Sequence, residues 1–208
     1  MDEYRRFHPE FSLCGLNCSL CPRRWTEGSS RCPGCGAPRA EGAPGSPARP
    51  GFSDIHPTCA VITCAKKRGS PEFCFLCADY PCDRYRNIGT ADSFISYRHV
   101  KENLAKAQEN LDSYLDELAE REAFLALLLD GWNDSRRKGF YCLAANDLPI
   151  GSVREVCARL VEIDAQDAQN GADGSAECVP CSTDRARTAV RLLSAEADKA
   201  GFALALRK

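Results

Sequence analysis

Cysteine is the residue type that most restricts what this chain can fold into. The 208 residues include 14 cysteines, and ten of them lie in the first 82 residues. These ten are Cys14, Cys18, Cys21, Cys32, Cys35, Cys59, Cys64, Cys74, Cys77 and Cys82. In a secreted chain this density would indicate a disulfide framework, but the start MDEYRRFHPEF lacks the apolar segment of a signal peptide. We therefore expect a cytoplasmic protein with reduced thiols, and reduced thiols at this density indicate a bound metal.

Two CxxC pairs, separated by ten residues, predict one closed zinc site. The pairs are Cys18 with Cys21 and Cys32 with Cys35. Two intervening residues let both sulfurs of a tight turn reach the same ion, and two such turns complete a tetrahedral shell. This layout is typical of a zinc ribbon or zinc knuckle.

A second zinc site is expected from the later cysteines. The CxxC pair of Cys74 and Cys77 is followed by Cys82, and one or both of Cys59 and Cys64 would complete the shell. Two tetrahedral sites need eight sulfurs.

Some donors are therefore surplus to two zinc ions. Cys14 and one of Cys59 or Cys64 are left over, unless a sulfur bridges two ions or a third ion binds. His56, in the sequence HPTC, is a further candidate ligand.

The order of the cysteine motifs resembles that of a known family. CGLNCSLCP, CPGCG, CAVITCAKKRG and FCFLCADYPCDRY follow one another over residues 12–90. This series closely resembles the cysteine-rich CGL family, catalogued as domain of unknown function 3795. The resemblance implies metal binding, with zinc as the ion, and implies no particular reaction. The chain departs from the commoner members in a long Ala/Pro/Gly insertion after Cys35.

The size of the cysteine-rich region leads to the expected fold. The loop at about residues 39–53, RAEGAPGSPARPGFS, cannot pack a core, which leaves little apolar material on either side. A segment this small needs a staple, and bound zinc can supply one. We predict a small α+β protein, with a metal-stapled, zinc-ribbon-like module at residues 1–90. Residues 91–208 should form a mainly helical C-terminal domain with a short two-stranded element.

Apolar periodicity predicts the helices of this C-terminal domain. A long helix, with or without a break, is expected over residues 96–130, and Ser152 with Glu155 forms a capping box that should begin the next helix. A last helix is expected over residues 182–200. The segment FALALRK at residues 202–208 alternates like a strand and could pair with residues 140–143.

Four cysteines lie in the second half of the chain. Cys142 and Cys157 fall on apolar faces, where a free cysteine acts as a small buried hydrophobe. Cys178 and Cys181 form a fourth CxxC pair, for which a pair without function, a third metal site and a redox pair all stay open.

The cysteines also allow functions other than a zinc scaffold. Cys14, Cys18 and Cys21 have the CxxxCxxC spacing that resembles the cluster signature of radical S-adenosylmethionine enzymes, although Leu20 stands where that family has an aromatic residue. An iron–sulfur or thiol redox enzyme is therefore one alternative. Metal handling and nucleic-acid binding are the others, the latter because short basic runs such as residues 66–68 lie beside cysteines.

Composition favours a binding role. The net charge of −2 and the pI near 6.0 give no general reason to expect nucleic acid as a partner, and no apolar run is long enough for a membrane span. No strongly supported Ser/His/Asp set, phosphate loop or paired-carboxylate motif is visible. The sequence thus predicts a zinc-binding protein with structural metal, acting as an interaction or regulatory module for an unknown protein partner.

Overall fold

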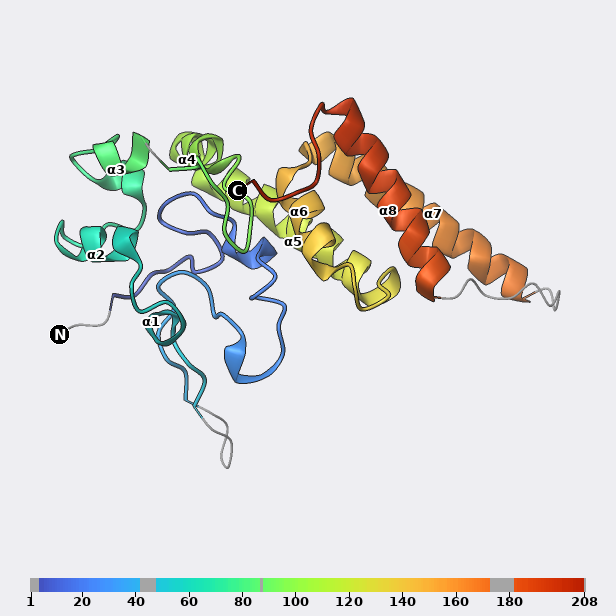
Figure 1. Ribbon diagram of the computed structural model, residues 1–208, viewed down its shortest axis with the longest axis horizontal. Coiled ribbons are helices and arrows are strands. Elements are labelled where there is room, and N and C mark those ends of the chain that lie inside the picture. The colour runs from blue at the N-terminus through green and yellow to red at the C-terminus, as the bar shows by residue number, and fades with distance from the viewer. Residues whose placement is uncertain (1–3, 42–47, 87, 173–181, 208) are drawn as a thin grey trace. The chain divides into compact units, whose positions relative to one another are not determined.

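The computed structural model describes residues 4–41, 48–86, 88–172 and 182–207 (Figure 1). The chain divides into two compact units, and each is described by itself. The first unit comprises Met1–Leu118 with Arg207–Lys208, and the second unit comprises Ala119–Leu206. The division falls within the helix α5, Leu111–Gly131.

The first unit is built from short helical turns joined by irregular chain. Its elements before α5 are the 3-10 turns η1 (Cys18–Leu20), η2 (Gly28–Ser30) and η3 (Cys74–Leu76), and the helices α1 (Phe52–Ile55), α2 (Ala60–Lys66), α3 (Asp83–Arg86) and α4 (Val100–Glu109). Strand pairing in the described residues is restricted to two isolated bridges, Phe11 with Asn17 and Ala40 with Arg49.

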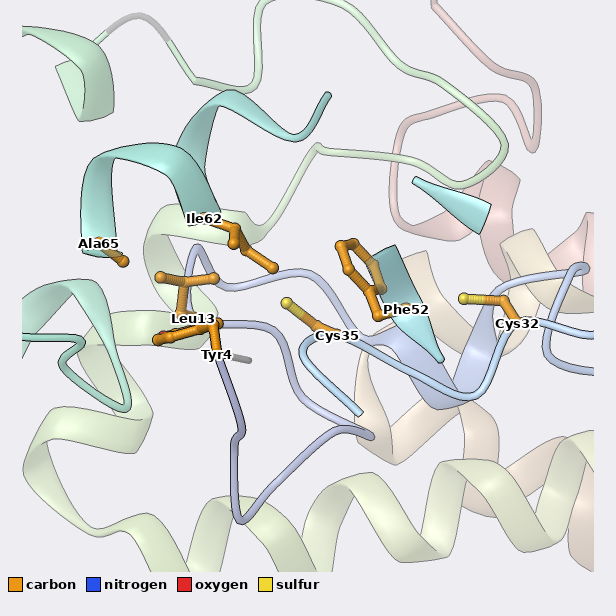
Figure 2. Packing of buried hydrophobic residues seen from close by; sticks show 7 residues of the cluster. All are labelled: Tyr4, Leu13, Cys32, Cys35, Phe52, Ile62 and Ala65. Carbon is orange, nitrogen blue, oxygen red and sulfur yellow. The ribbon is translucent and has the colours of Figure 1, made fainter. Parts of the chain in front are cut away.

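One apolar cluster holds these turns together (Figure 2). Its members come from the N-terminal segment, from the loop that carries two cysteines, and from α1 and α2. They are Tyr4, Leu13, Cys32, Cys35, Phe52, Ile62 and Ala65. Because burying one large apolar side chain contributes about 1.5–3 kcal/mol, this cluster can tie the four segments together without a sheet.

Contacts with α4 and with the start of α5 complete the core of the first unit. The rings of Phe11 and Tyr114 lie 4.8 Å apart, and the Tyr114 hydroxyl donates a buried hydrogen bond of 2.8 Å to Asn17 Oδ1. Asn103 Nδ2 on α4 donates to the carbonyl of Gly15 at 3.0 Å. Residues after position 90 therefore fix the N-terminal loop that carries the first cysteines.

The second unit is helical and contains α6 (Lys138–Asp147), α7 (Ile150–Ala172) and α8 (Ser182–Lys199), with the rest of α5. The helices α7 and α8 pack along one another (Figure 1). Arg121 on α5 is buried and donates to the carbonyls of Ala145 and Leu148, at 2.8 and 2.9 Å. Those carbonyls lie at the end of α6 and would otherwise lack partners. No helix of the described residues is both long enough and apolar enough to cross a membrane.

The predicted α+β fold with a two-stranded element is wrong. Residues 140–143 belong to α6, and residues 202–207 form no strand. All residues from Tyr141 to Leu148 are buried, and a short apolar stretch fits a buried helix as well as a strand. The C-terminal segment instead bonds to Asp92, which accepts the backbone N–H of Arg207 at 2.6 Å.

The predicted metal-stapled ribbon module is also wrong. Within residues 4–41, 48–86, 88–172 and 182–207, no group of three or more His, Cys, Asp or Glu side chains is arranged so that it could hold a metal ion. Hairpins of the kind a ribbon needs are absent from the same residues. The prediction assumed that residues 1–90 lack a sufficient core, whereas Leu104, Tyr114 and Leu118 add buried side chains to this unit.

The helix expected over residues 96–130 is divided at Asn110. The backbone of Asn110 is extended, with φ −153° and ψ 101°, and this residue separates α4 from α5. Asn110 Oδ1 accepts the N–H of Ser113 at 3.0 Å, which is the bond of a helix N-cap. The apolar spacing continues across the break, so periodicity alone did not locate it.

Candidate functional site

Each of the ten cysteines predicted to bind metal lines at least one of two cavities in the first unit. The large cavity, of about 500 Å³, is lined by Cys14, Cys18, Cys21, Cys32, Cys35 and Cys59. The small cavity, of about 40 Å³, is lined by Cys14, Cys64, Cys74, Cys77 and Cys82. The structure thus brings together residues as far apart as position 14 and position 82.

Main-chain hydrogen bonds hold the cysteines of the large cavity. The N–H of Cys21 donates to the carbonyl of Cys18 at 3.2 Å across the turn η1. The N–H of Cys32 donates to Arg23 at 2.9 Å, and that of Cys35 donates to Pro9 at 2.8 Å. These bonds fix the backbones of both CxxC pairs that line the cavity.

His56 lies at the same cavity, as the sequence allowed. Its Nε2 is 3.7 Å from the sulfur of Cys32. Burial, with a smaller contribution from Arg23, lowers the pKa of His56, so the imidazole is neutral at neutral pH. A neutral imidazole nitrogen is a metal donor, and His56 therefore has the correct protonation state for a ligand.

The small cavity is formed around a second cysteine turn. The N–H of Cys77 donates to the carbonyl of Cys74 at 3.1 Å across η3, while Cys64 comes from α2 and Cys82 precedes α3. Cys82 also accepts, through its carbonyl, the N–H of Tyr85 at 3.0 Å. Cys64 is therefore the partner of the Cys74–Cys77 turn here, whereas Cys59 lines the large cavity.

Burial keeps several of these thiols protonated. It raises the pKa of Cys35 and of Cys74 to about 12, and it also raises the pKa of Cys14 and of Cys21. Burial is the main cause for Cys18 as well, and the nearby cysteines add to it, so its pKa lies well above the usual value. A metal ion that binds here must displace these protons.

The chemistry of these donors fits a thiophilic ion, although their present spacing does not close a coordination shell. The sulfurs share cavity walls, but the described residues contain no arrangement that could hold an ion as it stands. All the described cysteines are free thiols. Uptake of an ion would therefore require the sulfurs to move toward the Zn–S distance of about 2.3 Å.

The remaining cysteines lie apart from the two cavities. Cys142 is buried in α6 and Cys157 is half-buried in α7, both in the second unit. The pair of Cys178 and Cys181, with its open alternatives, lies outside the described residues.

Two residues near the thiols were not expected from the cysteine pattern. Ser12 Oγ lies 3.1 Å from the sulfur of Cys14. Arg6 is a buried cation whose Nη1 donates to the carbonyls of Phe11 and Cys35, at 2.7 and 3.5 Å. The signal for Ser12 is its place two residues before a cysteine, but serine at that place has many other roles. Nothing in the sequence marks Arg6 as buried.

Comparison of the chain with known protein families, with curated proteins and with solved structures found no match. The resemblance to the cysteine-rich CGL family therefore stays a prediction. Function is therefore inferred from the residues of the two cavities.

Proposed function

We propose that the first unit is a zinc-binding module that takes up one ion in each thiol cavity. The observation that carries this proposal is the grouping of all ten cysteines on the walls of two cavities. Each cavity offers at least four sulfurs, which is the number that a tetrahedral zinc site requires.

The two groups of sulfurs support separate sites. Cys64, Cys74, Cys77 and Cys82 are together at the small cavity, and the two earlier CxxC pairs are together at the large one. Thiolates are the donors that zinc prefers in such sites.

The proposed role is binding or regulation, with a protein as the partner. Zinc surrounded by four protein sulfurs has no exchangeable water, so it lacks the open position that metal catalysis requires. Ion uptake would instead draw the sulfurs of a cavity together and so change the surface of the first unit around them. No observation specifically favours a redox or nucleic-acid role over this one.

Metal analysis of the full chain tests the proposal. The protein would be purified without oxygen or chelator and its zinc and iron contents measured, with the expected result of about two zinc ions per chain. Cys21→Ser and Cys77→Ser, which change half-buried residues of different cavities, should each lose one ion. Cys157→Ser, in the second unit, is the matched control and should lose none.

Two outcomes would overturn the proposal. Brown protein that contains iron and no zinc would replace the zinc module with an iron–sulfur protein. Colourless protein that neither contains zinc nor binds it on titration would eliminate metal binding by these cysteines.

A further inference from the structure

Apolar side chains form a large part of the wall of the large cavity, in addition to its cysteines. Phe52, Ile55, Phe94, Ile95 and Tyr97 are among them. The volume of about 500 Å³ lies within the range of about 300–1,000 Å³ that is typical of small-molecule sites, which are lined mainly by apolar and aromatic residues. The cavity therefore has space and apolar surface that a metal ion does not use.

Arg23 gives this wall a positive charge without a negative partner. No Asp, Glu or Lys is among the described residues that line the cavity, and Arg23 is the single arginine there. Its Nε is buried and has no hydrogen-bond partner within the described part of the chain. A buried donor without a partner is costly, so a ligand that supplies an acceptor would be stabilised here.

The guanidinium of Arg23 lies next to an aromatic surface. Its central carbon is 5.1 Å from the centre of the Phe94 ring, which lines the same cavity. Phe94 is 55% exposed, so part of this ring is open to a ligand. A charged group and an aromatic ring are thus available side by side.

Hydrogen bonds hold both of the segments that carry Arg23 and Phe94. The carbonyl of Arg23 accepts the N–H of Cys32 at 2.9 Å. On the other segment, Asp92 Oδ1 accepts the N–H of Tyr97 at 2.8 Å. The two groups are therefore fixed before a ligand binds, which reduces the cost of ordering them on binding.

We infer that the large cavity binds a small aromatic carboxylate. The carboxylate pairs with the guanidinium of Arg23, and the aromatic body of the ligand contacts the open part of Phe94 and the apolar wall. The inference goes beyond the proposed zinc function, because neither of these two residues is a metal ligand.

A carboxylate fits this cavity better than a phosphate does. A guanidinium presents a planar fork of N–H donors that matches a carboxylate through two hydrogen bonds. The single charge of Arg23 balances one negative charge, whereas a phosphate dianion would leave a second charge without a partner beside an apolar wall. An aromatic body is favoured because aromatic rings pack on one another in offset-stacked or edge-to-face contacts.

Calorimetric titration of the reduced full chain with naphthoate tests the inference, both on the protein as purified and after a chelator has removed metal. Naphthoate should bind. The uncharged naphthamide has the same ring system and should bind about tenfold or more weakly, because hydrogen bonds to charged groups are the stronger ones. Acetate has the charge without the rings and should give no measurable binding. Equal affinity for naphthoate and naphthamide would overturn the inference.

Two variants test the role of the guanidinium. Arg23→Gln should weaken the binding of naphthoate by about tenfold or more and should leave the weaker binding of naphthamide unchanged. Arg31→Gln removes the same charge from an exposed residue of the first unit that lines neither cavity, and it should bind naphthoate as the wild type does. Unchanged affinity of Arg23→Gln for naphthoate would overturn the pairing.

Nuclear Overhauser effects give a readout on the wild type, so it does not depend on whether a variant folds. Ring protons of bound naphthoate should show cross-peaks to the ring protons of Phe94. Cross-peaks to the second unit alone, or no binding of naphthoate with or without metal, would overturn the inference. Protein that contains zinc and binds no naphthoate would overturn this inference alone, whereas protein that binds naphthoate and takes up no zinc would support it and overturn the zinc function.

Discussion

Replacement of Gly15 by alanine tests how the turn before the first CxxC pair is held. The φ of +96° lies in the left-handed region, and an added Cβ would meet the Val100 carbonyl oxygen at 2.2 Å. Contacts of a Cβ below 3.0 Å are essentially never seen, so the turn and α4 must separate by about 0.8 Å. The colliding atom is main chain, and no side-chain rotation can remove the contact.

The expected loss of stability has two parts. The left-handed conformation costs a residue with a Cβ about 1–2 kcal/mol. Separation of the turn from α4 also strains the hydrogen bond from Asn103 to Gly15, of 3.0 Å, and the bond from the Tyr85 hydroxyl to Val100, of 3.3 Å. At about 1 kcal/mol for each bond, the total is about 3–4 kcal/mol. Such a loss is a large part of the 5–15 kcal/mol typical of a folded domain.

Gly28→Ala is the matched control for this substitution. Gly28 has a φ of +75° and no atom within 4 Å of an added Cβ, so only the conformational cost of about 1–2 kcal/mol applies. Urea unfolding would be followed by the fluorescence of Trp25 in a Trp132→Phe background, because Trp25 belongs to the first unit and Trp132 to the second. Equal destabilisation by the two alanine substitutions would refute the argument from close contact with α4.

Three further substitutions test contacts in both units. Burial alone would raise the pKa of Asp92, but hydrogen bonds from Arg207 and neighbouring N–H groups lower it to about 2. The ionised Asp92 therefore stabilises the folded protein, and the wild type should lose this contribution to the free energy of unfolding as the pH falls from about 4 to 2. Arg207→Gln should flatten that part of the pH–stability curve. Arg185→Lys should cost about 1–2 kcal/mol in thermal unfolding, because the guanidinium stacks 4.0 Å from the centre of the Trp132 ring; an unchanged melting temperature would contradict this. Tyr141→Phe removes a buried hydrogen bond of 2.5 Å to the Trp132 carbonyl and should cost about 1–3 kcal/mol in urea unfolding.

Local periodicity predicted the helices of the C-terminal half better than it predicted their ends. The helix expected over residues 182–200 is confirmed as α8, Ser182–Lys199. The helix expected to begin at the capping box of Ser152 and Glu155 begins earlier, as α7 starts at Ile150 directly after Pro149. The first helical bond runs from the N–H of Val153 to the carbonyl of Pro149, at 3.1 Å. Proline is favoured in the first turn of a helix, so Pro149 and the capping box indicate two different starting points for this helix.

The fold of the first unit could not be predicted from the cysteine pattern. The pattern indicates which sulfurs approach one another, but it contains no information on the apolar contacts that position the turns. Phe11 packs against Phe73 and Tyr114, at 5.5 and 4.8 Å between ring centres, and these residues lie far apart in the sequence. Such long-range packing has no local period, so the need for a metal staple was overestimated.

The sorting of cysteines between cavities shows where sequence spacing is informative. Each CxxC pair lines a single cavity, because its two residues share one turn. The sequence did not indicate which of Cys59 and Cys64 lies near the Cys74–Cys77 pair. The position of each residue relative to α2 determines which cavity it lines. Cys59 precedes that helix, while Cys64 lies on it and contributes to the small cavity.

Charge around the buried sulfurs explains why the proposed function needs a cation from outside the chain. Arg6 is buried next to Cys35, and its charge lowers the pKa of that thiol, yet burial still raises the value to about 12. The guanidinium is also paired with Glu72, with 3.2 Å between Nη2 and the carboxylate, so much of its charge is already neutralised. The protein's own buried cation therefore cannot sustain a thiolate at Cys35 near neutral pH. A divalent ion among the sulfurs would add two positive charges at the place where the negative charge forms, which is what deprotonation of several neighbouring thiols requires.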